Sequence, residues 1–239
     1  MMIMELEIQL VVGLMVFGIC FGAQAEWRPE EFPNPWTEFT KCGQPRPSYL
    51  CDPNNIVSRK YSDFIEYHLN RVPNVTNCPC STWHCEHTTK PEGYRIAIAV
   101  MTKMKNDYDF DDKKDLAFNF AYGLESRRWD FGSCENDIII LYSELDGMIY
   151  TLAGSTAREK LSLAKAGEIQ GALLHFFQPG GNVGHGLASM VLNYIAVLRD
   201  EYFMPTWTID GNGAASVQHV IVLPLAVIAL YRVFQFLLN

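Results

Sequence analysis

Basic side chains are scarce in this sequence, and they do not cluster. The chain has 239 residues, with 19 Lys and Arg against 27 Asp and Glu, so its formal net charge is −8. Lys113-Lys114 and Arg127-Arg128 are isolated pairs, best interpreted as solvated faces. Binding of nucleic acid or of an anionic membrane surface relies on a basic patch. The composition therefore argues against both of these partners.

Sequence motifs of common enzymes are also missing. The chain has no G-x-S-x-G, no H-E-x-x-H and no phosphate-binding P-loop. A glycine-rich stretch at 180–186 resembles an anion site at a helix N-terminus, but it lacks the Lys and the Ser or Thr of a P-loop, which favours a simple turn. His185 within this stretch could act as a base, yet no nucleophile accompanies it in the sequence. We predict no catalytic residue and no cofactor.

One acidic run has the residue types of a metal site. Asp107, Asp109 and Asp111 stand at alternate positions, and oxygen ligands with that spacing suit calcium. An EF-hand loop beginning at Asp107 would need Gly at position 112 and Glu at 118, where the chain has Asp112 and Phe118. The favoured interpretation is an acidic cap at a helix N-terminus. The three aspartates remain weak calcium candidates, and we expect no metal.

The N-terminal end of the chain is apolar. Residues 10–22 have the length of the hydrophobic region of a signal peptide, and Ala23-Gln24-Ala25 matches a cleavage site. We predict a signal peptide over 1–25, with an uncleaved signal anchor as the alternative. A signal peptide implies the secretory route and an oxidising compartment.

The C-terminal end is apolar as well. Residues 217–238 are long enough to cross a bilayer, and Arg232 near their distal end fits a cytoplasmic flank. We predict a single-pass plasma-membrane protein of type I, with its N-terminal domain outside the cell. A GPI anchor attached at Asn212, Gly213 or Ala214 is the alternative.

Six cysteines follow the predicted signal peptide, and an even number in an exported chain predicts three disulfides. They are Cys42, Cys51, Cys78, Cys80, Cys85 and Cys134. We expect Cys42 to pair with Cys51, because a short segment without its own core needs a local staple. We expect Cys134 to pair with one of the three cysteines at 78–85, leaving the other two to pair together. A zinc site that used these three cysteines and His87 is the less favoured alternative.

A glycosylation sequon, Asn74-Val75-Thr76, is consistent with the secretory route. We therefore predict a glycan on Asn74.

The order of periodic segments predicts an α/β fold in which helices flank a small mixed sheet. Strands are expected at 94–102, at the apolar run 138–141 and at 148–153, with a hairpin turn at Asp146-Gly147 between the last two. Helices are expected at 56–72, 112–126, 157–177 (interrupted by Gly167 and Gly171) and 183–201. The connection between the first two strands is long enough for a parallel, right-handed crossover.

These signals divide the chain into five parts. They are the signal peptide (1–25), a Cys- and Pro-rich strap (26–55), an α/β ectodomain (56–203), a juxtamembrane spacer (204–216) and a transmembrane segment (217–238). Six prolines between positions 29 and 53 exclude long elements in the strap, so we expect it to lie extended on the ectodomain.

Several of these motifs together resemble a known family. The hook NPW…CGQPRPSYLCDP at 34–53, the W-x-x-G at 129–132 and YTLAG at 150–154 are similar to the modulator of levamisole receptor family of nematodes, over about residues 34–201. The resemblance implies a TPM-type α/β sandwich and a single-pass auxiliary protein that positively modulates a levamisole-sensitive acetylcholine receptor. TPM-type domains often carry a Thr-Asp pair after the hairpin, where this chain has Leu161-Ser162-Leu163. That departure weakens any transfer of metal binding or phosphatase activity.

The leading hypothesis is a non-enzymatic cell-surface protein that binds subunits of a ligand-gated acetylcholine receptor and modulates the channel. A TPM-type metal-dependent phosphatase and a generic cell-surface interaction module are the alternatives.

Overall fold

The structure is a computed structural model, and it describes residues 25–87, 93–201, 206–209 and 215–218. All but the last residue of the predicted signal peptide lies outside the described residues, as does the predicted membrane segment beyond residue 218.

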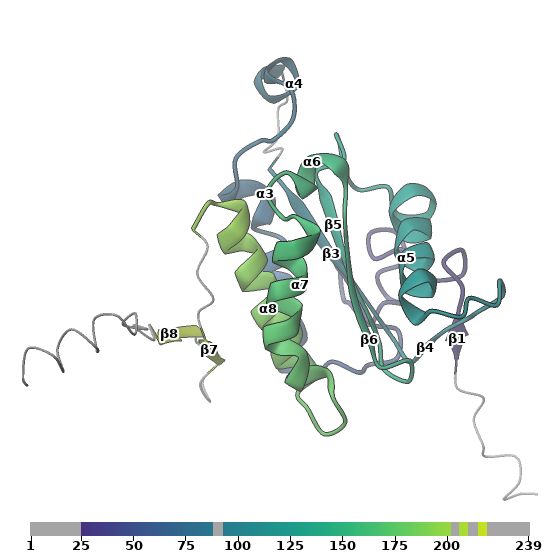
Figure 1. Cartoon of the computed structure of the whole chain (residues 1–239). Coiled ribbons are helices and arrows are strands. Elements are labelled where there is room, and N and C mark those ends of the chain that lie inside the picture. Colours follow the sequence, from purple (N-terminus) through teal and green to yellow (C-terminus); the bar gives the residue numbers. More distant parts are fainter. Residues whose placement is uncertain (1–24, 88–92, 202–205, 210–214, 219–239) are drawn as a thin grey trace, which may run out of the picture.

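A four-stranded mixed sheet forms the centre of the folded body (Figure 1). Its order is β2 (Leu50–Cys51), β3 (Arg95–Met101), β5 (Asp137–Ser143) and β6 (Met148–Ala153). The first three strands run parallel and β6 is antiparallel to β5, which confirms the predicted crossover and hairpin. Every residue of β5 is buried, as expected for a continuous apolar run in a strand covered on both faces.

The hairpin turn between β5 and β6 follows the Asp-Gly prediction. Gly147 has a φ of 60°, a left-handed conformation that favours glycine. The carboxylate of Asp146 accepts hydrogen bonds from the Ser143 hydroxyl and, at 2.9 Å, from the backbone N–H of Met104. The turn therefore also fixes the short strand β4 (Lys103–Met104), in a stretch that was expected to be a loop.

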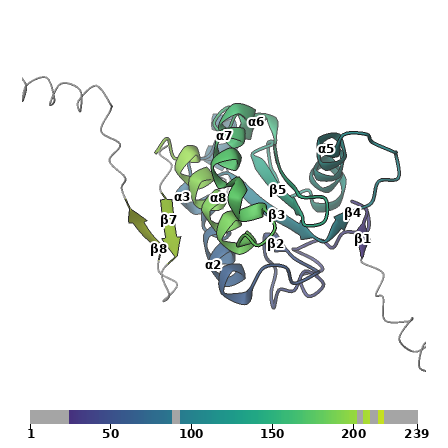
Figure 2. The ribbon, with the colours of Figure 1, turned by 60° about the horizontal axis from the view of Figure 1, so that its bottom comes forward.

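Three helices cover one face of the sheet (Figures 1 and 2). They are α2 (Arg59–Leu69), α7 (Leu163–Leu173) and α8 (Val183–Leu198). Their apolar side chains pack on Ile96, Ile98 and Ile138, which point to this face by the alternation of the strands. The prediction of a helix at 157–177 interrupted by its glycines was wrong in one respect. The break lies at 159–162, between the short helix α6 (Ser155–Arg158) and α7, and both glycines lie inside α7.

That break has a local cause. The Ser162 hydroxyl accepts a hydrogen bond from the Lys165 backbone N–H at 3.3 Å and so caps the start of α7. The helix then continues through Gly167 and Gly171, because Ala166 and Ile169 are buried in the core and hold it in place. The chain continues from α7 into the 3₁₀ turn η2 (Leu174–Phe177) before it reaches α8.

The opposite face of the sheet is covered by α5 (Lys113–Gly123), the π-helical turn η1 (Leu124–Trp129) and the strap. Asp112 caps α5 by accepting a hydrogen bond from the Lys114 backbone N–H at 2.8 Å, as the acidic-cap interpretation expected. The strap begins with β1 (Glu26–Trp27), which pairs in parallel with β4, and its Phe32 side chain is fully buried.

Two regions contain more regular structure than expected. The stretch 73–93, predicted to be irregular, includes most of α3 (Val72–Val75) and all of α4 (Thr82–His87). The predicted spacer includes β7 (Thr206–Ile209), which pairs antiparallel with β8 (Ala215–Gln218). The expected membrane segment was assigned from residue 217, yet Val217 and Gln218 belong to β8. The sequence Thr-Trp-Thr-Ile at 206–209 consists entirely of residues that favour strands. Within the described part of the chain, we find no helix with the length and apolarity needed to span a bilayer.

The buried face of α2 differs from the expected one. The spacing of Tyr61, Phe64, Ile65, His68 and Leu69 by three and four residues predicts that they form the buried face. Ile65 and Leu69 are buried, but Tyr61, Phe64 and His68 are only partly buried. Ser62 and Glu66 are buried instead, because the strap supplies polar partners for them. Gln44 donates to the Ser62 hydroxyl at 3.1 Å, and Arg46 donates to the Glu66 carboxylate at 3.3 Å.

Candidate functional site

Three disulfides join the six cysteines at 42–134. The structure confirms the Cys42–Cys51 pair. Of the pairings left open for Cys134 it selects Cys80, so that Cys78 pairs with Cys85. No thiolate therefore remains at 78–85 to bind the zinc ion of the alternative interpretation.

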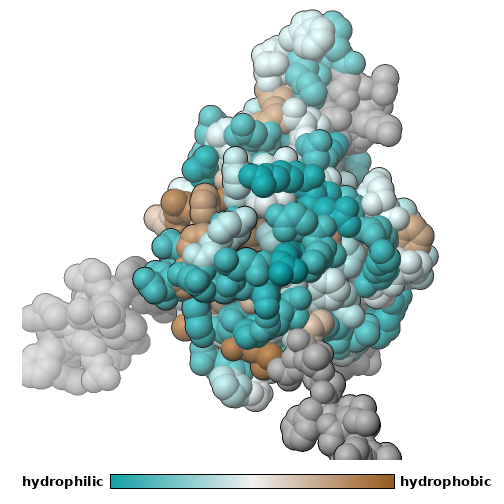
Figure 3. Space-filling view, turned by 90° about the vertical axis from the view of Figure 1, so that its right-hand side faces the viewer, coloured by the Kyte–Doolittle hydropathy of each residue, from teal (hydrophilic) through white to brown (hydrophobic). Residues whose placement is uncertain are grey.

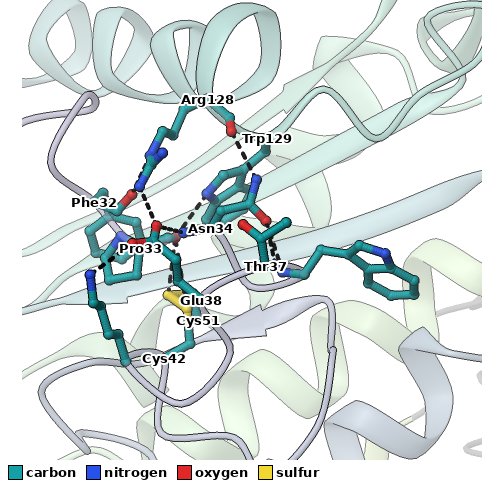
Figure 4. A network of polar contacts seen from close by, with 11 residues as sticks. Phe32, Pro33, Asn34, Thr37, Glu38, Cys42, Cys51, Arg128 and Trp129 are labelled. Atoms are coloured by element: carbon teal, nitrogen blue, oxygen red, sulfur yellow. Dashed lines mark hydrogen bonds and ion pairs between the residues drawn. A yellow bond between two sulfur atoms is a disulfide. The ribbon is translucent and has the colours of Figure 1, made fainter.

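A network of polar contacts, which we call the clasp, locks the strap to the end of η1 (Figure 4). The Arg128 guanidinium donates to the Phe32 carbonyl at 3.0 Å and pairs with the Glu38 carboxylate. The Trp129 indole N–H donates to the Pro33 carbonyl at 3.0 Å, and the Asn34 amide donates to the Arg128 carbonyl at 2.9 Å. Arg128 was expected to be a solvated surface residue. It is instead a partner of the strap.

The Cys42–Cys51 disulfide lies directly under the clasp. The sulfur atoms of Cys42 and Cys51 are 3.7 Å and 3.4 Å from the Pro33 carbonyl oxygen, and both residues are fully buried. Asn34 shapes the next turn, because its side-chain oxygen accepts the backbone N–H groups of Trp36 and Thr37 at 2.9 Å and 3.1 Å. The clasp thereby fixes the direction in which the backbone continues through Trp36 and Thr37.

The carboxylate of Glu38 is stabilised in its charged form. The hydrogen bond from Lys41 lowers its pKa most, followed by the backbone N–H of Asn34, and the charge of Arg128 adds to the effect. A paired carboxylate of this kind favours the folded state at neutral pH.

Beside the clasp lies a cavity of about 570 Å³, which we call the aromatic cavity. Its walls come from the strap, α3, the start of β3 and the loop after η1. The residues that line it are Asn34, Pro35, Trp36, Thr37, Ser48, Tyr49, Pro73, Asn74, Arg95, Ala97, Trp129, Asp130, Phe131 and Gly132. The volume lies within the roughly 300–1,000 Å³ of ordinary small-molecule sites.

Four aromatic rings form a continuous wall of this cavity. The ring centroids of Trp36 and Tyr49 are 5.3 Å apart, those of Tyr49 and Phe131 are 6.0 Å apart, and those of Phe131 and Trp129 are 6.4 Å apart. Trp36 stands at the open side with 52% of its surface exposed. Exposed aromatic rings grouped around a hollow are typical of binding sites.

Few charged groups line the aromatic cavity. The Arg95 guanidinium donates to the Phe131 carbonyl, and Asp130 follows η1 in a left-handed conformation with a φ of 41°. The lining residues include no His, Cys or Lys. The lining is therefore mainly aromatic and uncharged, with Arg95 and Asp130 as its charged groups.

A second hollow, the acidic pocket, adjoins the aromatic cavity and shares Asp130 and Gly132 with it. It has a volume of about 450 Å³ and contains Glu125, Glu135 and Asp137. Gly132 is required here, because a Cβ atom would lie 2.3 Å from the Asp137 carboxylate. Sequence analysis did not identify this cluster. The only signal for it was the Glu135-Asn136-Asp137 run after Cys134.

The carboxyl groups of the acidic pocket have pKa values that are shifted in opposite directions. Burial raises the pKa of Asp137, and the charges of Glu135 and Asp130 add to this rise. Burial also raises the pKa of Glu125, with Asp137 as the next cause. Glu135 behaves differently, since its hydrogen bonds with Ser155 lower its pKa. Within the described ranges, no three or more His, Cys, Asp or Glu side chains are placed to hold a metal ion.

The weak calcium candidates are not assembled into a site. Asp107 pairs with Arg28, and this pairing lowers the pKa of Asp107. Asp109 has a φ of 52° in the loop before α5. Among described residues, Asp107, Asp109 and Asp111 join no cluster that could bind a metal. Their interpretation as part of an acidic loop leading to the cap of α5 agrees with the structure.

The glycines at the start of α8 allow neighbouring side chains to pack closely against the helix. A Cβ atom at Gly184 would lie 2.7 Å from the Tyr61 side chain, and one at Gly186 would lie 2.7 Å from Phe177. The ring of His185 stacks on Phe176, with centroids 4.5 Å apart. Asn182 caps the helix by accepting the His185 backbone N–H at 3.0 Å. Close helix contacts account for these glycines without an anion.

The segment 78–87, which we call the knob, projects from the body (Figure 1). The described side chains of α4 include no buried one, and Trp83 is 69% exposed. Trp83 stacks on His87, with centroids 4.9 Å apart. Figure 3 shows the knob above a body whose α5 side is covered mainly by hydrophilic residues. Two disulfides hold the knob where an apolar core would otherwise be needed.

Comparisons with solved structures find two bacterial domains. The N-terminal domain of a protein from P. gingivalis is 16% identical, with a TM-score of 0.49 over 73% of this chain and 92% of that chain. The BA42 protein of Bizionia argentinensis is 12% identical, with a TM-score of 0.44 over 64% of this chain and 88% of that chain. No protein of curated function matches the sequence.

A comparison with protein families gives a specific match. Residues 27–147 match the family described as modulator of levamisole receptor-1. This segment contains the strap, the clasp, the aromatic cavity, the knob and the sheet up to the hairpin turn, and it covers more than half of the chain. The protein is therefore a member of the modulator of levamisole receptor-1 family.

Proposed function

We propose that this protein is a non-enzymatic auxiliary protein that binds the extracellular side of a levamisole-sensitive acetylcholine receptor and raises its response. The observation that carries the proposal is the family match over 27–147, whose description names a receptor modulator. A bound protein changes channel opening when it has a higher affinity for one channel state than for another. Modulation therefore requires a rigid binding surface and no catalytic group.

The knob supports this proposal. Trp is enriched among the residues that contribute most to binding at protein interfaces, and Trp83 is exposed on a segment with two cross-links. Because the knob is already ordered, binding through it loses less conformational entropy than binding through a flexible loop. We assign Trp83 as the principal receptor contact.

The proposed location is the cell surface, with a TPM-type ectodomain outside and the apolar stretch that follows β8, up to residue 238, as the tether. Three disulfides support an oxidising environment for the ectodomain. Replacing Val227 with Arg would place a charge near the middle of the apolar segment, at a cost of about 2.5–3.5 kcal/mol, and should abolish stable anchoring. Release of the native protein by phosphatidylinositol-specific phospholipase C would instead identify a lipid anchor.

The direct test is co-expression with levamisole-sensitive receptor subunits in oocytes. We expect a larger levamisole-evoked current with the native protein than without it. Trp83→Ala should remove most of the increase, because loss of a central interface Trp costs on the order of 2 kcal/mol of binding energy. Tyr108→Ala is the matched control, since Tyr108 is also a highly exposed aromatic residue but lies away from the knob. Surface labelling must show equal amounts of all three proteins.

An unchanged current, together with failure to co-purify receptor subunits, would contradict the proposal. Metal-dependent phosphatase activity that is lost when Asp107, Asp109 and Asp111 are replaced by Ala would favour the enzymatic alternative. Modulation that survives Trp83→Ala would leave the receptor proposal intact and reject Trp83 as the contact.

A further inference from the structure

The predicted glycosylation site lies on the wall of the aromatic cavity. Asn74 belongs to α3, is exposed, and lines the cavity together with Pro73. The Thr of the sequon faces the other way. The Thr76 hydroxyl donates to the Val72 carbonyl at 2.7 Å and accepts from the Tyr94 backbone N–H at 2.9 Å. The turn that carries Asn74 is therefore fixed against the start of β3, and the asparagine is held at the edge of the hollow.

The cavity has the chemistry of a sugar site. The C–H groups of a pyranose ring carry partial positive charge, and the faces of aromatic rings carry partial negative charge, so the two surfaces attract. Trp36 and Tyr49 provide an apolar wall at the open side, and Asp130 and Arg95 provide polar groups for hydroxyl and acetamide groups. Apolar walls with a few polar groups are the usual composition of a small-ligand pocket.

We propose that the glycan on Asn74 folds back over the aromatic cavity, and that its first N-acetylglucosamine packs against Trp36. Attachment at the cavity wall gives the sugar a high effective concentration, so it needs little intrinsic affinity to occupy the site. The glycan then covers the one large exposed ring of the strap and leaves Trp83 of the knob uncovered. The inference depends on the secretory route that the proposed function also needs, but not on receptor binding.

The experiment uses the full chain, extracted with detergent from cells that make only high-mannose glycans and labelled with ¹⁵N at tryptophan. Endoglycosidase H leaves the first sugar on Asn74, whereas peptide N-glycosidase F removes the whole glycan from the folded protein. We expect the Trp36 indole signal to keep its position after the first enzyme and to shift after the second. The Trp36→Phe variant assigns the signal. The Trp83 signal should stay unchanged throughout and serves as the internal reference.

Two variants separate the sugar from other causes. Peptide N-glycosidase F converts the linked asparagine to aspartate, so Asn74→Asp, which lacks both the sequon and the glycan, should reproduce the spectrum of the fully deglycosylated protein. Thr76→Ser keeps both the sequon and the hydroxyl group that bonds to Val72 and Tyr94, so it should retain the native Trp36 signal. Absence of a mass change with peptide N-glycosidase F would overturn the inference. If the Trp36 indole signal does not shift when the whole glycan is removed, the inference is also overturned, even if receptor modulation has been demonstrated.

Discussion

The strap and the knob share two sequence features but differ in the burial of their side chains. Both are short, non-periodic and closed by a local disulfide, with separations of 9 residues for Cys42–Cys51 and 7 for Cys78–Cys85. In the strap, Phe32 and both cysteines are fully buried. In α4 of the knob, no described side chain is buried. A local disulfide therefore supplements a core in one segment and replaces a core in the other.

We relate this difference in burial to two roles, which are to build the aromatic cavity and to present Trp83 to a partner. The strap supplies walls of the aromatic cavity, so its position relative to η1 must be fixed, and the clasp fixes it. The knob keeps Trp83 away from the core and so leaves it available to a partner. Changes in the strap should therefore alter stability, whereas changes in the knob should alter binding.

The largest expected effect is the loss of the Phe32 ring. Phe32 contacts the rings of Trp27, Phe120 and Trp129, at centroid distances of 5.4, 5.8 and 6.1 Å. Phe32→Ala should lower the free energy of unfolding by about 3–5 kcal/mol, because it leaves a cavity in the core. Denaturant unfolding followed by tryptophan fluorescence measures the change.

The matched control for Phe32 is Trp36, a large aromatic residue of the same strap that is half exposed. Trp36→Ala should change the free energy of unfolding of the deglycosylated protein by no more than about 0.5 kcal/mol. Equal losses for the two variants would mean that the strap does not belong to the core.

The second comparison removes one disulfide from each segment by paired Cys→Ala changes. Loop entropy alone predicts about 2.5 kcal/mol for either pair, because the two separations are similar. We expect about that loss or more for Cys42 with Cys51, since their sulfur atoms are buried against Pro33. For Cys78 with Cys85 we expect less than about 1 kcal/mol, because a knob without a core gains freedom in the folded and unfolded states alike. Thermal unfolding of the two variants under the same conditions provides the ranking, and a larger loss in the knob would reverse our interpretation.

A smaller effect on the melting temperature depends on pH and has opposite signs for Glu38 of the strap and Asp137 of β5. The folded protein holds the pKa of Glu38 below its unfolded value, chiefly through Lys41, so the resulting stability is present at neutral pH and is lost as the pH falls through the folded pKa. Glu38→Gln should therefore lower the melting temperature at pH 7, and the difference should close in acid.

Asp137, close to the anchor of the knob at Cys134, should respond with the opposite sign. Burial raises its folded pKa, so its contribution to stability is present below the unfolded pKa and is lost as the pH rises through the folded pKa. Asp137→Asn should raise the melting temperature at pH 7, and this difference should also close in acid. Melting curves between pH 3.5 and 8 test both variants, and a shift of the same sign at pH 7 would refute this assignment of charges.

Local patterns were sufficient to predict much of the sheet. The apolar run of β5, the Asp-Gly turn and the strand-favouring run of β6 are properties of adjacent residues, and the structure has each of them where the sequence indicated. The Cys42–Cys51 pair was predictable for the same reason, since both cysteines lie in one short loop.

The candidate site could not be predicted in this way. The clasp joins Asn34 to Arg128 across 94 residues and Pro33 to Trp129 across 96, so no local pattern links them. The buried polar side of α2 depends on Gln44 and Arg46 of the strap, and periodicity alone placed apolar residues there. Tertiary contacts with the strap decided both features.

The second disulfide of the knob has a mechanical consequence. Cys80–Cys134 attaches the knob just before the first residue of β5, and in Figure 1 the knob lies beyond that end of the strand. A partner that pulls on Trp83 therefore loads β5 along its own axis. β5 is hydrogen-bonded to β3 along one edge and to β6 along the other. A load along the strand axis shears the hydrogen bonds of both rows at the same time, instead of opening them one after another. Tension applied to the exposed knob is thus transmitted in part to β5, a strand whose residues are all buried.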